Sequence, residues 1–156
     1  MAWTDSRILR SFITDLLLQD VAYDLNGSTP KVALYNDTPT PAVDAARTAA
    51  AYNTGQWANT AEVSHSGQWA AGGIALGSPA VTNPATGVAM FDAADTASGS
   101  AATLANVHGA FVYADAITTP IADPGISYHY FGGPQAVTNG TFTIVWAANG
   151  LFRITV

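Results

Sequence analysis

Cysteine is absent from this sequence, and charged residues are scarce. Without cysteine the chain can form neither a disulfide framework nor a thiolate zinc site, and it has no cysteine nucleophile. Charged residues make up 10% of the chain, whereas ordinary soluble domains carry roughly 25%. A surface so poor in charge repels copies of itself only weakly, so subunits can approach one another closely. The composition therefore favours an assembly subunit, with a rigid secreted β-domain as the alternative.

Basic residues are too few and too scattered to form a phosphate-binding surface. The net charge is -6, and the five basic residues are spread along the chain: Arg7, Arg10, Lys31, Arg47 and Arg153. Nucleic-acid binding needs clustered Lys and Arg, so we expect no nucleic-acid partner. The first residues lack the basic-then-apolar layout of a signal peptide, and no apolar run approaches the roughly 20 residues of a membrane span. We therefore expect a chain made in the cytoplasm, with no membrane partner.

Motifs of the common enzyme classes are missing as well. The sequence has no Gly-x-Ser-x-Gly elbow, no His-Glu-x-x-His, no phosphate-binding loop and no dinucleotide fingerprint. The remaining candidates are His65, His108, His129 and the pair Asp92 and Asp95. Isolated histidines in such a chain are usually packing residues, Asp-rich loops usually form turns, and calcium needs six or more oxygens. The sequence predicts a protein that is not an enzyme and has no catalytic, metal or cofactor site, while a hydrolase stays as an alternative.

A short helix is predicted near the N-terminus. Thr4 or Asp5 can cap it, and its apolar residues recur with helical spacing: Ile8, Leu9, Phe12, Ile13, Leu16 and Leu17. This stripe lies opposite the polar positions Arg7, Arg10, Thr14 and Asp15. Residues 1–28 are thus expected to form an amphipathic helix or arm, which lies on the domain's own sheet or docks on a neighbouring subunit. Leu16 and Leu17 are its candidate interface residues.

After Pro30 the sequence is typical of strands and loops. Strands are predicted over residues 31–35, 88–92, 104–113 and 126–131. Near the C-terminus Phe142, Ile144 and Trp146 alternate onto one face, and a second apolar set could meet them across a hairpin: Phe152, Ile154 and Val156. Residues 29–156 are therefore expected to form a β-rich region, an antiparallel β-sandwich or barrel-like domain. With the N-terminal helix they make a single structural domain.

Two near-identical tetrads each contain a tryptophan. Gly55-Gln56-Trp57-Ala58 and Gly67-Gln68-Trp69-Ala70 begin at positions 55 and 67, a spacing that suits successive strands of an antiparallel sheet. Glycine beside tryptophan is typical of close packing, which makes Trp57 and Trp69 core or interface residues. Flat rings with neighbouring amides could instead stack on sugars. We take Trp57, Trp69 and Phe152 as further interface candidates.

Four segments resemble a family of virion proteins: KVALYNDTP (31–39), AYNTGQW (51–57), FDAADTA (91–97) and TIVWAANGLFR (143–153). They are similar to small structural proteins of tailed bacteriophages that infect actinobacteria, encoded among the head genes close to the major capsid protein. The likeness runs from about Ser6 to Val156. It implies a capsid decoration or minor capsid protein, made in the host cytoplasm and carried on the outer surface of the phage head. The family has no catalytic motif to carry over.

The resemblance also implies the partners. We expect the major capsid protein of the same phage as one partner, and a homo-oligomer, a trimer or other cyclic assembly, as the form of the chain itself. The N-terminal helix or the C-terminal hairpin would lie at the contacts between copies. The alternatives are a tail-tube or tail-associated subunit, and a glycan- or receptor-binding module that uses Trp57 and Trp69.

Overall fold

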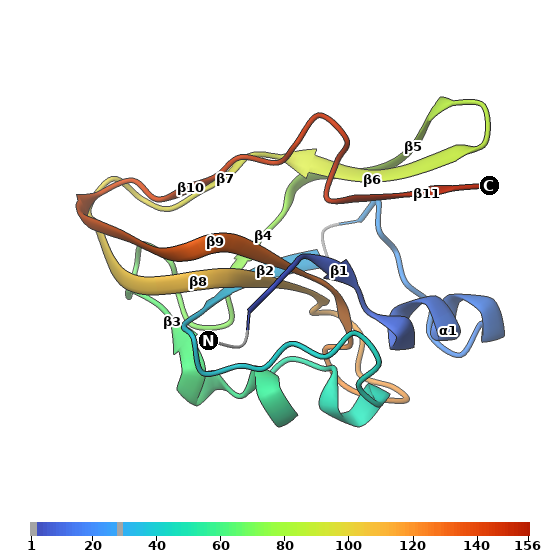
Figure 1. The fold of residues 1–156 in the computed structure, drawn as a ribbon, viewed down its shortest axis with the longest axis horizontal. Helices are drawn as coiled ribbons and strands as arrows, with labels where there is room; N and C mark the ends of the chain where they lie inside the picture. Colours follow the sequence, from blue (N-terminus) through green and yellow to red (C-terminus); the bar gives the residue numbers. More distant parts are fainter. Residues whose placement is uncertain (1–2, 28–29) are drawn as a thin grey trace.

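Antiparallel sheets in two layers make up most of the protein (Figure 1). The computed structural model describes residues 3–27 and 30–156, and it has 45% strand and 12% helix. The first layer is a six-stranded sheet with the order β1-β9-β8-β2-β3, to which β4 is added on β2. Its strands are β1 (Arg7–Ile8), β2 (Pro30–Tyr35), β3 (Glu62–Val63), β4 (Ile74–Ala75), β8 (Ala102–Ala114) and β9 (Gly125–Gly140).

The second layer lies above this sheet in the view of Figure 1. It consists of a three-stranded sheet, β11-β6-β5, and a two-stranded sheet, β10-β7. Its strands are β5 (Gly77–Ala85), β6 (Val88–Ala94), β7 (Thr96–Ala97), β10 (Thr143–Ile144) and β11 (Phe152–Thr155). The prediction of a mainly β, antiparallel, sandwich-like fold with one helix near the N-terminus is confirmed. The predicted boundary between residues 28 and 29 lies outside the described residues.

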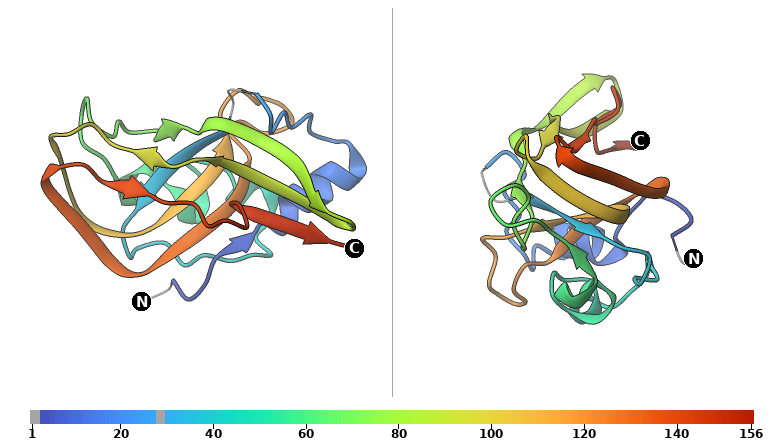
Figure 2. Two further views of the ribbon diagram at one scale, coloured as in Figure 1. Left: turned by 90° about the horizontal axis from the view of Figure 1, so that it is seen from above. Right: turned by 90° about the vertical axis from the view of Figure 1, so that its left-hand side faces the viewer.

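A single long ribbon builds both layers. Residues 88–114 and 125–155 run antiparallel along their whole length, through the pairs Tyr113↔Gly125, Ala102↔Gly140, Ala97↔Thr143, Phe91↔Phe152 and Val88↔Thr155. The ribbon folds back on itself at residues 98–101 and 141–142, which lie together at one end of the molecule (Figure 2). Because one half of the ribbon covers the other, the space between the layers becomes core.

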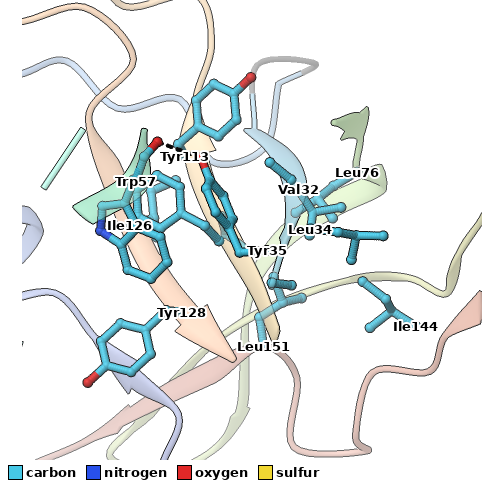
Figure 3. Packing of buried hydrophobic residues seen from close by; sticks show 14 of the residues in the cluster. Val32, Leu34, Tyr35, Trp57, Leu76, Tyr113, Ile126, Tyr128, Ile144 and Leu151 are labelled. Carbon is cyan, nitrogen blue, oxygen red and sulfur yellow. Dashed lines mark hydrogen bonds between the residues drawn. The ribbon is translucent and has the colours of Figure 1, made fainter. Parts of the chain in front are cut away.

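The six-stranded sheet is buried on both faces in its centre. On β2, Val32 and Leu34 face the second layer, whereas Tyr35 faces the opposite side. Figure 3 shows Leu76 and Ile144 with the first group and Trp57 with the second. Strands that are covered on both faces have near-continuous apolar sequences rather than alternating ones. This explains why residues 32–35, which follow Lys31, form an unbroken apolar run.

The side of the sheet that faces away from the second layer is aromatic. We call it the aromatic face, defined by Tyr35, Trp57, Phe111 and Tyr128. The Trp57 ring stacks on Phe111 at a centroid distance of 4.2 Å. The Tyr35 hydroxyl donates a hydrogen bond of 2.6 Å to the Trp57 carbonyl oxygen. The segment that covers this face contains three short 3-10 helices: η1 (Arg47–Ala49), η2 (Gly55–Trp57) and η3 (Asn59–Ala61).

The helix α1 (Arg10–Leu18) begins later than predicted. Thr4 and Asp5 do not cap it; instead Arg7 and Ile8 form β1 against β9, and the Leu9 N–H donates to the Ile126 carbonyl oxygen at 3.0 Å. Arg7 and Ile8 gain ladder hydrogen bonds to β9, and Ile8 is partly buried, which together outweigh a capping preference worth about 1 kcal/mol. The helix ends at Gln19, which adopts a left-handed conformation.

The buried stripe of α1 also differs from the prediction. Phe12 is buried as expected, but so is Asp15, which the spacing placed on the polar side. The Arg47 guanidinium pairs with the Asp15 carboxylate, and the Tyr23 hydroxyl donates to it at 3.2 Å. Burial of a carboxylate is tolerated where it is paired and hydrogen-bonded. The helix therefore turns its polar Asp15 inward, and it exposes the leucines that follow.

Two predicted pairings are wrong. The C-terminal segments do not form a hairpin with each other, because β10 pairs with β7 and β11 pairs with β6. The tryptophan tetrads do not lie on successive strands: Trp57 ends η2, and Trp69 lies in a turn bridged to His65. For the C-terminal segments, the partner strands β7 and β6 lie far away in the sequence. For the tetrads, the pattern gave the correct packing class but the wrong secondary structure.

Candidate interaction surface

The three histidines are each held by different neighbours. The His65 Nδ1 accepts the Thr103 N–H at 2.8 Å, and His108 is buried in β8 beside the Asn106 carbonyl oxygen. His129 lies 3.0 Å from the Ser127 Oγ, and its ring packs edge-on against Trp146. Burial lowers the pKa of His129 to about 4. The Ser127 side chain is completely buried, so this serine–histidine pair offers no nucleophile to a substrate.

The aspartate pair does not form a site either. The Asp95 carboxylate accepts the backbone N–H of Trp146 at 3.0 Å, while Asp92 lies on β6 opposite Ala80 of β5. Across residues 3–27 and 30–156, no group of three or more His, Asp or Glu side chains is placed to hold a metal ion. Within the same ranges, no helix is long and apolar enough to cross a membrane.

The only glutamate, Glu62, holds a turn in place. Its carboxylate accepts the Tyr52 hydroxyl at 2.7 Å and the Gly72 N–H at 2.8 Å. Burial raises the pKa of Glu62 above its ordinary value, and these two hydrogen bonds oppose that shift. The Tyr113 hydroxyl donates to the Gly72 carbonyl oxygen at 2.6 Å. These hydrogen bonds join Tyr52, Glu62 and Tyr113 to the Gly72 backbone, so the cluster clamps the turn.

That turn has to contain glycine. Gly73 has a φ of +76°, and a Cβ atom at this position would collide with the carbonyl oxygen of Val32 on β2. The clamp was not predicted from the sequence. A sole glutamate in a chain so poor in charge, followed ten residues later by Gly72-Gly73, was the available signal.

Trp57 and Trp69 are core residues. Both have zero exposure, and Trp69 packs edge-on against Phe142 where the ribbon folds back. A sugar-binding platform needs accessible ring faces, and an interface residue needs access to the partner. In the folded chain neither tryptophan ring is accessible to a sugar or to a partner. The interface and sugar-binding predictions for Trp57 and Trp69 are therefore wrong, and both residues pack in the core.

Exposed apolar side chains gather at one end of the molecule. Among the described residues, eight large hydrophobic side chains are exposed, and six of them belong to α1, β5 and the β11 segment: Leu16, Leu17, Leu18, Val81, Ile154 and Val156. A seventh, Val43, is tied to the start of α1 because its carbonyl oxygen accepts the Arg10 N–H. Leu16, Val81 and Ile154 line a common groove, and Leu17 and Leu18 follow Leu16 on α1. We call the end of the molecule that carries these five exposed side chains the apolar end. Leu17, the most exposed of these five, has 79% of its surface accessible.

A groove of about 130 Å³ lies within the apolar end, between α1 and the three-stranded sheet. Its walls are apolar side chains, among them Phe12 and Leu16 from α1, Val81 from β5, and Phe152 and Ile154 from β11. Phe12 and Phe152 meet edge-on at a centroid distance of 5.8 Å. The volume approaches that of a 150 Å³ apolar cavity that binds benzene, so it suits one large apolar side chain.

Of the five interface candidates, three belong to this surface. Leu16 and Leu17 are exposed on α1, and Phe152 is half-buried in the groove wall. Leu18, Val81 and Ile154 were missed. The run Leu16-Leu17-Leu18 was the available signal, because three consecutive helical residues span roughly 200° and cannot all face one sheet.

Comparison of the chain with protein-family models, with curated proteins and with solved structures gave no match.

Proposed function

We propose that this chain is a non-enzymatic structural subunit of a tailed-phage particle, a capsid decoration or minor capsid protein that binds and stabilises the head shell. The apolar end carries the proposal, because a large exposed apolar patch marks an interaction surface. The resemblance of four sequence segments to phage head proteins supplies the setting.

The energetics favour coverage of this end by a partner. Full burial of one leucine side chain contributes roughly 1.5–3 kcal/mol, and α1 alone exposes three leucines in a row. With charged residues at 10% of the chain, little electrostatic repulsion opposes close approach of another subunit. The apolar end thus combines a driving force for association with a weak barrier against it.

The net charge of -6 fits the outside of a shell better than the inside, because packaged DNA attracts basic rather than acidic surfaces. The major capsid protein is the proposed partner. Many identical contacts around a shell give avidity, so each contact can be modest.

The test is to separate purified virions into heads and tails and to measure the amount of this chain relative to the major capsid protein. A fixed ratio in heads supports the proposal. Recovery in tails contradicts it in favour of a tail-tube or tail-associated subunit, and absence from both fractions ends the virion proposal.

A matched pair of variants links the test to the surface. Leu17→Asp places a charge in the apolar end, and Val145→Asp places one at a residue of similar exposure, 72% against 79%, outside it. Added to shells that lack the chain, the Val145→Asp protein is expected to bind as the wild type does, and Leu17→Asp to bind at least tenfold more weakly.

A further inference from the structure

The two edges of the three-stranded sheet differ in their ability to accept another strand. Along β5, Pro79 and Pro84 have no N–H, and both lie where the register with β6 shifts. The Val81 N–H is already bonded to the Asn26 Oδ1 at 2.6 Å. Prolines, irregular register and side-chain capping are devices that keep an edge strand from pairing. The β5 edge is closed.

The β11 edge has none of these devices. It consists of four residues without proline and stands at the end of the strand order (Figures 1 and 2). The Val156 N–H donates to the Gly87 carbonyl oxygen at 2.9 Å. Because hydrogen bonding alternates along an antiparallel strand, the backbone of Ile154 also faces β6, and the N–H and C=O groups of Arg153 and Thr155 point outward. Arg153, Ile154 and Thr155 are all exposed.

The open edge and the apolar end share one side of the molecule. The side chains of Phe152 and Ile154 line the groove against Phe12 and Leu16 of α1. A specific interface usually buries more than about 1,000 Å², which four strand residues do not reach alone. An occupant must therefore offer a strand edge and an apolar surface together, and a second copy of this chain offers both side by side. Contacts about a two-fold axis require such self-complementarity.

We infer that β11 pairs antiparallel with the β11 of a second copy of this chain across a two-fold axis. The register that uses every outward backbone group sets Arg153 opposite the partner's Thr155 and Ile154 opposite the partner's Ile154. It keeps the two Arg153 charges from facing each other, and it joins the two three-stranded sheets into one. Leu16 and Leu17 of both copies then flank the seam.

A ring of three copies built on this sheet would need β11 to pair with β5, and the β5 edge is closed. The assembly is therefore a pair, which narrows the trimer or other cyclic assembly expected from the sequence. The inference rests on the proposed function, because it assigns a second copy of this chain as a partner of the apolar end that the proposed function uses.

Disulfide trapping tests the pair directly, because the natural chain has no cysteine. Residues at the centre of such a pair have Cα atoms about 4.5 Å apart, within the range of about 4.4–6.8 Å that a disulfide spans. Under mild oxidation, Ile154→Cys is expected to convert most of the protein to a dimer that thiol reduction reverses. Val81→Cys is the matched control, because Val81 lies in the same sheet with 44% exposure against 40% for Ile154, but on the closed edge. It should form no disulfide-linked dimer, although its β11 still pairs as in the wild type.

A second variant tests the backbone bonds themselves. Thr155→Pro removes an outward N–H and leaves the β6 ladder intact, so it should weaken self-association at least tenfold with unchanged circular dichroism. The inference is overturned if Ile154→Cys forms no disulfide-linked dimer, or if both cysteine variants form it to the same extent. It is also overturned if Thr155→Pro self-associates as strongly as the wild type. Recovery of the chain in heads together with any of these results removes the pair and keeps the proposed function. If the disulfide-linked dimer forms but the chain is absent from virions, the pair is kept and the proposed function is removed.

Discussion

Hydrophobic side chains are buried on the aromatic face and exposed at the apolar end. On the aromatic face, Tyr35 and Trp57 have zero exposure, and the Tyr35 hydroxyl finds a partner in the Trp57 carbonyl group. The segment with the three 3-10 helices covers that face together with Trp3, whose ring meets Trp57 edge-on at a centroid distance of 5.6 Å. At the apolar end, Leu17 and Leu18 of α1 keep 79% and 63% of their surface exposed.

The exposure of large hydrophobic side chains is therefore concentrated at the apolar end and is not a general property of the chain. The protein covers a whole sheet face with a long loop segment, and it even buries Asp15 of α1 by pairing that carboxylate with Arg47. The same helix leaves three leucines in solvent. Side chains that stabilise the fold and side chains that serve association are thus separated in space, and each group can be changed without the other.

The largest expected effect comes from the aromatic face. Trp57→Ala removes a ring that stacks on Phe111, and it should lower the free energy of unfolding by about 3–5 kcal/mol. Leu17→Ala changes an exposed side chain and should stay within about 0.5 kcal/mol of the wild type. Denaturant titration of both variants measures the contrast, and equal losses would remove the distinction between the two regions.

The Gly72-Gly73 turn gives the next effect. Gly73→Ala forces a Cβ atom into the Val32 carbonyl oxygen at a φ of +76°, so we expect a loss of roughly 2–4 kcal/mol. Gly67→Ala is the control, because Gly67 has a φ of +75° with nothing near its Cβ position, and it should lose only about 1 kcal/mol. If thermal unfolding shows similar losses of stability for both variants, the positive φ rather than the clash with Val32 accounts for the need for glycine at position 73.

Acid should weaken the region between the two layers. The pKa of His129 is lowered to about 4 in the folded chain, against about 6.5 when unfolded. The unfolded state therefore binds the proton first, and stability falls as the pH drops from about 6.5 towards 4, by roughly 1–3 kcal/mol. His129→Gln should lose this part of the pH dependence. Unfolding free energies at pH 7 and pH 4.5 provide the measurement, and an unchanged slope in the variant would contradict it.

A smaller effect is expected at Glu62. Tyr52→Phe removes the hydroxyl that donates to the Glu62 carboxylate, which should reduce stability by about 1–2 kcal/mol at pH 7. The pKa of Glu62 is already raised by burial, so its contribution to stability falls as the pH rises through that pKa. Loss of the donor raises this pKa further. The deficit of the variant should therefore shrink on acidification, and a deficit independent of pH would rule out the ionised carboxylate as the acceptor.

Local patterns predicted the strands but not their pairing. Residues 31–35, 88–92, 104–113 and 126–131 were predicted as strands and are confirmed as β2, β6, β8 and β9, since an apolar run or alternation is a property of the segment itself. Ile144 was correctly assigned to a buried face, yet its partner is Thr96 rather than the C-terminal segment. Alternation defines which side chains share a face, and it carries no information on the distant strand that supplies the ladder.

The residues of the apolar end were predicted only in part, because their exposure also depends on contacts between residues far apart in the sequence. Leu16 and Leu17 were chosen from helical spacing, and they are exposed because the Asp15 and Arg47 pair sets the rotation of α1. That pair joins residues far apart in the sequence. The sequence favoured core or interface packing for Trp57 and Trp69 over a sugar-binding platform, and only the covering segments place both in the core. Ile154 depends on the open edge of β11, which exists only once the sheet order is known.

The central claim, that the apolar end is an association surface, is tested most directly by native mass. Sedimentation of the wild type over a range of concentrations should show reversible association to a dimer. The double variant Leu17→Asp, Leu18→Asp should remain a monomer with the same circular dichroism and the same free energy of unfolding to within about 0.5 kcal/mol. A wild type that stays monomeric at every concentration, or a double variant that associates as strongly as the wild type, would contradict the account.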